Sequence, residues 1–148
     1  THSIGTVCTL QDARIGRGYS PQQIRAALEA YQELCAVIEA GGSAAQFWRY
    51  ALYDLHLELP PGVSHAPFPR EASYWQLVIL RADLDRAIDS LPRHLRAPAD
   101  LIWRQGLDVG LACYRLRISR RTLYNRLAAA ERHVVRKIVA QNQAKCHS

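Results

Sequence analysis

Apolar residues recur every three or four positions over several long stretches of the chain. The first stretch follows Ser20 and Pro21, a serine cap with proline at the first helical position, and Gln23 can complete a capping box. This pattern predicts a helix over residues 20–40, which the glycine pair beginning at Gly41 would end. Its apolar stripe consists of Ile24, Leu28, Tyr31, Cys35 and Ile38.

A second amphipathic stretch follows the glycine pair, and Ser43 can cap it as a helix. The proline-rich segment 58–70 then interrupts regular structure, so we predict a linker or an ordered loop there. Since the segments on both sides carry an apolar face, we expect the N-terminal helices to pack on the later ones or on a partner. The apolar residues of this second helix are Phe47, Trp48, Ala51, Leu52 and Leu55.

The helical period resumes at Ser73 and continues until Pro92 breaks it, which predicts a third helix. The apolar positions of this helix are Leu77, Leu80, Leu84, Ile88 and Leu91. Charged residues fall mainly on the opposite side, where we expect solvated charges, and these are Asp83, Asp85, Arg86 and Asp89.

Beyond the third helix, Pro98 can open a short fourth helix that runs through Trp103 and ends at Gly106. No part of the chain alternates apolar and polar residues over a useful length, so we predict essentially no sheet. The expected fold class is therefore all-α.

Residues 106–127 have the layout of a helix, a tight turn and a second helix. Asp108 can cap the first helix, Ile118 would anchor the turn, and Ser119 can cap the second helix. Small residues on the first helix would let the second approach closely. The expected buried face consists of Val109, Ala112, Cys113, Leu116, Leu123 and Leu127. The apolar stripe continues through Ala130, Val134 and Ile138.

The residues left pointing outward are those that reading of the DNA major groove requires. Arginine bonds to guanine and asparagine to adenine, so we expect base contacts from Arg120, Arg121 and Asn125. Phosphate contacts are expected from Arg117, Ser119, Thr122, Tyr124 and Arg126. For Ser119 and Thr122 simple helix capping is the alternative, and for Tyr124 it is packing against a neighbouring helix.

The residues that match a known motif are Leu91, Pro92, Gly106, Leu107, Asp108, 116–127 and Ala130. Over residues 84–138 the chain resembles the region-4 helix-turn-helix of sigma factors, a look shared by phage late-gene regulators of the ArpU/RinA type and phage antitermination Q proteins. This resemblance implies a DNA-binding regulator that acts with RNA polymerase. Gly110 and Leu111 stand where the family has acidic residues. Arg117 replaces the glycine of the turn, so we expect a wider turn.

The distribution of charge agrees with such a site. The net charge is +6, and the segment 113–137 has eight basic residues against the single acidic Glu131, a net +7. The remaining 11 basic and 12 acidic residues sum to −1. A positive excess confined to one segment is typical of a phosphate-binding face, although a solvated arginine-rich helix face is the alternative.

Other functions have little support in the sequence. Cys35 and Cys113 lie among apolar residues and are expected to be buried, reduced thiols, and neither cysteines nor histidines have metal-ligand spacing. We expect no metal, no cofactor and no catalysis, because no phosphate loop or nucleophile motif is present. No apolar run is long enough to cross a bilayer, so we expect a cytoplasmic protein without membrane contact.

Together these patterns predict an irregular N-terminal arm (1–19), a helical region with a proline-rich loop (20–70) and a helix-turn-helix domain with a long recognition helix (71–148). The expected function is sequence-specific transcription regulation, with double-stranded DNA as the ligand. RNA polymerase or a sigma factor is a candidate protein partner, and a homodimer is also open. The alternatives are a non-enzymatic protein-binding adaptor and a DNA-packaging or recombination accessory.

Overall fold

The computed structural model describes residues 18–53, 59–60, 62–63 and 71–147, and the regular structure in these ranges is entirely helical. The expected all-α class is thus confirmed for this part of the chain. The arm up to residue 17, Leu55 and most of the proline-rich segment lie outside the described residues. The helices are α2 (Pro21–Glu29), α3 (Tyr31–Glu39), α4 (Ala44–Ala51), α5 (Glu71–Asp89), α6 (Arg93–Ala99), η2 (Asp100–Arg104), α7 (Val109–Leu116) and α8 (Arg120–His147).

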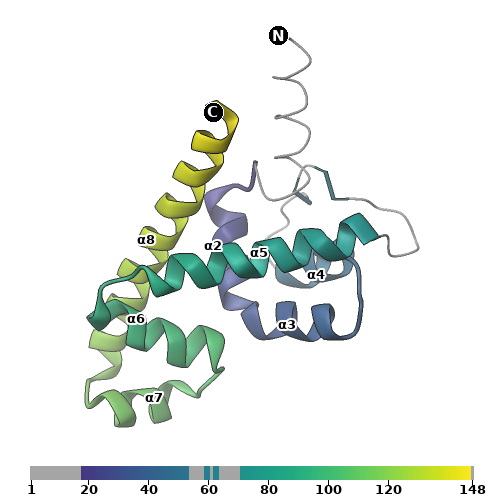
Figure 1. Ribbon diagram of the computed structural model, residues 1–148. Helices are drawn as coiled ribbons and strands as arrows, with labels where there is room; N and C mark the ends of the chain where they lie inside the picture. Colours follow the sequence, from purple (N-terminus) through teal and green to yellow (C-terminus); the bar gives the residue numbers. More distant parts are fainter. Residues whose placement is uncertain (1–17, 54–58, 61, 64–70, 148) are drawn as a thin grey trace.

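The single helix predicted for residues 20–40 is wrong, because the chain bends at Ala30. The predicted start is correct: the hydroxyl of Ser20 accepts from the amide of Gln23, and the Gln23 side chain accepts from the Ser20 amide. At Ala30 the backbone has φ −98° and ψ 22°, which ends α2 and starts α3 in a new direction (Figure 1). The bend lets α2 pack along α8 while α3 packs against α5.

Helix α4 is capped as predicted, since the hydroxyl of Ser43 accepts from the amide of Gln46 at 3.1 Å. Its buried Trp48 makes aromatic contacts on two sides, with ring centroids 5.3 Å from Tyr19 and 5.0 Å from Phe47. The amide of Ala44 also donates to the hydroxyl of Ser73 at 2.6 Å, which ties the start of α4 to the start of α5.

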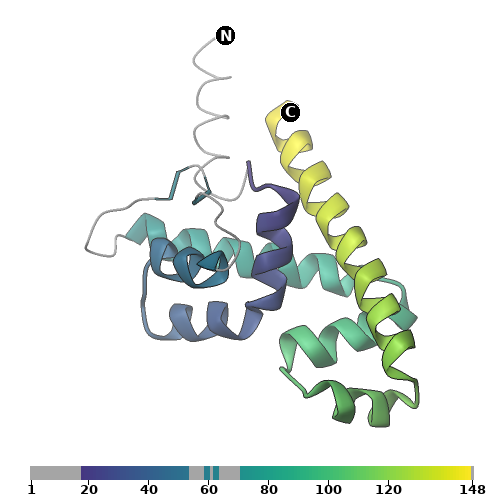
Figure 2. The ribbon, with the colours of Figure 1, turned by 180° about the vertical axis from the view of Figure 1, so that it is seen from behind.

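Helix α5 begins at Glu71, two residues before the predicted start, and forms the middle of the molecule (Figures 1 and 2). Its predicted apolar face is buried. The prediction that Asp83 lies on the solvent side is wrong, because only 5% of Asp83 is exposed. Helices α3 and α4 cover α5 along with α8, so more of its circumference is buried than one apolar stripe indicates.

Pro98 does not open a helix as predicted but lies inside α6, which begins directly after Pro92. Pro98 has no amide proton to donate, and the five residues that follow α6, Asp100–Arg104, wind as the wider π-helix η2. The amide of Gln105 accordingly donates to the carbonyl of Asp100, five residues back, at 2.9 Å. Gly106, with φ +67°, ends this helix as predicted.

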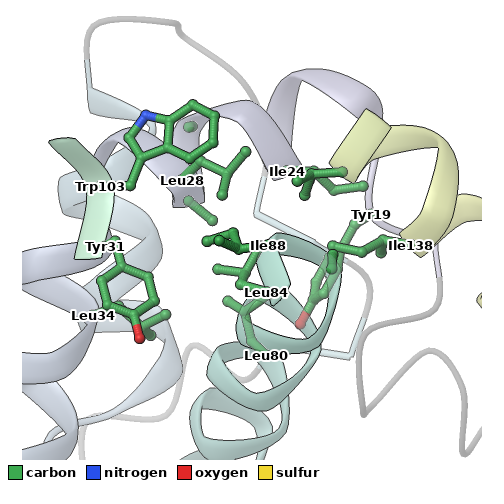
Figure 3. Packing of buried hydrophobic residues seen from close by; sticks show 14 of the residues in the cluster. Tyr19, Ile24, Leu28, Tyr31, Leu34, Leu80, Leu84, Ile88, Trp103 and Ile138 are labelled. Carbon is green, nitrogen blue, oxygen red and sulfur yellow. The ribbon is translucent and has the colours of Figure 1, made fainter. Parts of the chain in front are cut away.

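One cluster of buried side chains joins the N-terminal helices to the later ones, which confirms the expected packing between them. Figure 3 shows side chains of α2, α5 and α8 meeting in it, among them Leu28, Ile88 and Ile138. Because α8 contributes Ala130, Val134 and Ile138 to this core, its orientation is fixed by the rest of the molecule.

Candidate nucleic-acid interface

Helix α7 is short, and Ala112 is its buried residue. The carboxylate of Asp108 accepts from the amide of Gly110 at 2.9 Å, so the predicted cap is present. Ala112 is fully buried, whereas the other predicted face residues, Val109, Cys113 and Leu116, are half-buried. The thiols of Cys35 and Cys113 are free as expected but only half-buried, which corrects the prediction of full burial.

Three residues join α7 to α8, and the wider turn that we expected does not occur. Arg117 itself adopts the left-handed conformation, with φ 57° and ψ 47°. The amide of Ile118 donates to the carbonyl of Cys113 at 3.2 Å, which closes the end of α7. The left-handed conformation of an arginine costs on the order of 1 kcal/mol of conformational free energy. The turn bears this cost and does not become wider.

Helix α8 starts with the capping that the sequence predicts. The hydroxyl of Ser119 accepts from the amide of Thr122 at 3.1 Å and donates to the hydroxyl of Thr122 at 3.0 Å. Leu123 is fully buried below this first turn. From here α8 runs 28 residues, about 42 Å at 1.5 Å per residue, along one edge of the molecule (Figures 1 and 2).

The predicted contact residues divide into two groups by exposure. Thr122 and Arg126 are half-buried on the flank of α8. The exposed residues are Arg117, Ser119, Arg120, Arg121, Tyr124 and Asn125. Arg121 and Asn125 are four residues apart and share one outward face. Arg120 instead lies beside the start of α7: a Cβ built on Gly110 would be 3.5 Å from Arg120 Nη2.

The arginines of this region differ from the paired arginines elsewhere in the molecule. The side chains of Arg117, Arg120, Arg121 and Arg126 form no ion pair or hydrogen bond with another described residue. By contrast, Arg104 contacts three carboxylates. The positive charge at the start of α8 is therefore not neutralised within the described part of the protein.

Two further arginines extend the exposed face of α8 beyond the predicted site. Arg132 and Arg136 follow Asn125 by 7 and 11 residues, which are helical intervals, and both are exposed. The helical spacing of Arg132 and Arg136 is visible in the sequence, and it could have included them in the predicted site. The outward face of α8 thus carries Arg121, Asn125, Arg132 and Arg136.

An ionic cluster around Arg104 fixes η2 against α5, and through it the position of α7. The Arg104 guanidinium lies 2.7 Å from Asp89, 2.8 Å from Asp100 and 3.5 Å from Asp85. Burial by itself would lower the pKa of Arg104, but Asp89 and Asp100 outweigh burial and raise it. From α3, the Gln32 side chain also donates to the carbonyls of Trp103 and Arg104 at the end of η2.

A second ion pair joins α8 to α2. Arg25 Nε lies 2.9 Å from the carboxylate of Glu131, the one acidic residue in the basic segment. Burial raises the pKa of Glu131, and the neighbouring Glu29 raises it further, while Arg25 and Arg132 act in the opposite direction. This pair therefore links the orientation of α8 to the N-terminal helices.

Comparison of the chain with known proteins gave no match. Neither a family model nor a curated protein nor a solved structure corresponds to it. Within the described residues, no group of three or more histidine, cysteine, aspartate or glutamate side chains is arranged to hold a metal. No helix in those ranges has both the length and the apolar character to cross a membrane. The geometry of α7 and α8 is accordingly the main guide to function.

Proposed function

We propose that this protein is a sequence-specific DNA-binding transcription regulator whose helix-turn-helix consists of α7, the turn 117–119 and α8. The observation that carries the proposal is the pair Arg121 and Asn125. Both are exposed, without a partner among the described residues, and share a face in the first two turns of a helix held rigidly by the core. Arginine and asparagine are the residues that read guanine and adenine in the major groove.

In this proposal α8 is the recognition helix, and the residues around it contact the backbone. Arg120, Arg121 and Asn125 contact bases. Phosphate contacts come from Arg117, Ser119, Thr122, Tyr124 and Arg126. The exposed Arg132 and Arg136 add phosphate contacts further along α8. The hydroxyl of Ser119 already caps the helix, so its DNA contact would be additional.

The resemblance to sigma-factor region 4 suggests the biological setting. We propose that the protein acts with RNA polymerase as a late-gene activator or antiterminator of the phage type. It binds nucleic acid without catalysing a reaction. The N-terminal helices α2, α3 and α4 share one hydrophobic core with α8. A polymerase subunit or a second copy that binds these helices would therefore be held near the bound DNA.

The proposal is tested by selecting duplexes that bind the purified protein from a random library, and by titrating the best duplex at several salt concentrations. We expect one enriched motif with nanomolar affinity. Each phosphate contact should contribute about 0.9 to the slope of log affinity against log salt. A flat or sequence-blind selection would exclude a specific regulator and favour the packaging or adaptor functions.

Two substitutions separate base reading from phosphate contact. Arg121→Ala should cost about 1–3 kcal/mol of DNA-binding free energy and relax specificity at one base pair. Arg126→Ala should weaken the binding of all duplexes to a similar extent. It should also reduce the salt slope by about 0.9, the contribution of one phosphate contact. Arg49→Ala removes an exposed arginine from α4 and is the matched control, with no expected effect on DNA. If all three variants bind like the parent, the assignment of α8 is wrong.

A further inference from the structure

Helix α7 exposes two large apolar side chains on the side opposite its packing face. Leu111 is 48% exposed and Tyr114 is 80% exposed, while Ala112 between them is fully buried. Residues three apart lie on the same side of a helix, so Leu111 and Tyr114 form one surface. Helix α7 lies at one end of the molecule in both views (Figures 1 and 2).

An open hollow adjoins this surface where α7 meets the turn. Its half-buried residues, Gly110, Cys113 and Ile118, carry no charge. Tyr114, Arg115 and Arg117 line the same hollow and are exposed around it. The hollow therefore combines an uncharged base with an aromatic ring and two guanidinium groups.

The charge of the hollow is mainly positive. The charged residues that line it are Arg115 and Arg117, and the nearby carboxylate of Asp108 is held by the amide of Gly110. Neither Arg115 nor Arg117 forms an ion pair with another described residue. Arg117 also occupies a left-handed position that glycine would fill without strain, so the turn retains a positive side chain here at a conformational cost.

We propose that the outer face of α7, made of Leu111, Tyr114, Arg115 and the adjoining hollow, binds an acidic segment of a partner protein. An aromatic or aliphatic side chain of that segment would enter the hollow, while its carboxylates pair with Arg115. This inference goes beyond the proposed DNA binding and does not depend on it.

The chemistry of the face favours a protein over duplex DNA. A phosphate backbone can pair with the arginines but has no apolar side chain to cover Leu111 and Tyr114. Exposed apolar surface rimmed by polar residues marks protein contacts, and tyrosine and arginine carry much of the energy at such interfaces. Complementarity to the positive rim requires an acidic partner.

The test starts from a displayed library of random peptides selected on the immobilised full-length protein. The enriched peptides should combine aspartate or glutamate with an aromatic or aliphatic residue. Affinity of the best peptide is then measured by fluorescence anisotropy for variants of the face. Tyr114→Ala and Leu111→Ala should each weaken binding about tenfold, as expected for central anchor residues. Arg115→Glu should abolish it.

The matched control is Tyr50→Ala, because Tyr50 is also a largely exposed tyrosine, at 60%, but lies on α4. It should bind the peptide like the parent. All four substitutions are at exposed positions, and circular dichroism with thermal unfolding should show unchanged stability. If one α7 variant is unstable, the other two still test the face.

Three outcomes would overturn the proposal. The first is that no peptide is enriched, or that the enriched peptides lack acidic residues. The second is that the selected peptide binds the α7 variants as tightly as the parent. The third is that Tyr114→Ala weakens duplex DNA as much as Arg121→Ala does, which would make the face part of the DNA interface. Because peptide and DNA affinities are measured separately, failure of one proposal is distinguishable from failure of the other.

Discussion

The hydroxyl of Tyr31 on α3 donates a 2.6 Å hydrogen bond to the carboxylate of Asp85 on α5. The same carboxylate lies 3.5 Å from the guanidinium of Arg104 on η2, so one charged group connects three helices. Burial raises the pKa of Tyr31, and the bond to Asp85 raises it further, which keeps the hydroxyl protonated as the donor. The position of α7 after η2 thus depends on contacts that begin in the N-terminal helices.

Replacing Arg104 should destabilise the fold. Arg104→Met leaves Asp85, Asp89 and Asp100 without their shared cation, and the side chain of Arg104 is only 21% exposed. We expect a loss of about 2 kcal/mol in the free energy of unfolding, measured with urea. Arg93→Met, an exposed arginine on the neighbouring helix without an ion partner among the described residues, should change it by less than about 0.5 kcal/mol. Equal effects of the two variants would show that the ionic cluster around Arg104 does not contribute to the free energy of unfolding.

Glycine at position 117 should raise stability and weaken DNA binding at the same time. Arg117→Gly removes the left-handed strain but adds freedom to the unfolded chain, so we expect a net gain of about 0.5 kcal/mol. The salt slope of DNA binding should fall by about 0.9. Arg117→Ala is the comparison, because it loses the charge but keeps the strain. A stability gain in the alanine variant would contradict this explanation.

Two substitutions at Ser119 distinguish helix capping from phosphate contact. Ser119→Ala removes the acceptor of the Thr122 amide and should cost about 1 kcal/mol of stability. Ser119→Asp restores an acceptor at the cap and should recover most of that loss. Its negative charge would lie against the phosphates, so DNA affinity should drop below that of the alanine variant. Equal DNA affinity of both variants would mean that Ser119 only caps the helix.

The raised pKa of Glu131 predicts a pH dependence with a definite sign. A carboxyl whose pKa is higher in the folded than in the unfolded state keeps its proton to higher pH when folded. Its contribution to stability is therefore present below the ordinary value of 4.5 and is lost as the pH rises through the folded value. The stability of the parent minus that of Glu131→Gln should fall as the pH rises above the ordinary value of 4.5. Urea unfolding at several pH values measures this difference, and a constant or rising difference would refute the assignment.

Helix starts were the features that the sequence predicted best. Ser20, Ser43, Asp108 and Ser119 each cap a helix as expected. A cap depends on a hydrogen bond within three residues, so its signal is complete in the local sequence. The apolar period likewise identified the buried faces of α5 and α8, since it reports directly which side of a helix leaves water.

The candidate site was predicted in part. Local sequence indicated the residues of the turn and the first two turns of α8, because the helical period assigns them to the side away from Leu123. It did not show that Arg117 would take the left-handed conformation. It also did not show which arginines are neutralised, because Arg25 pairs with a carboxylate on another helix and Arg104 pairs with two on α5 besides Asp100 on its own helix.

The amino-acid pattern alone fixed the all-α class, the helix caps and the concentration of positive charge before and within α8. Only the tertiary structure showed the bend at Ala30, the burial of Asp83 and the position of Pro98 inside α6. The physical reason is the distance along the chain over which each interaction acts. Caps and periodicity act within one or two turns, whereas these three features depend on helices packing together from distant parts of the chain, as the bond from Tyr31 to Asp85, 54 residues away, illustrates.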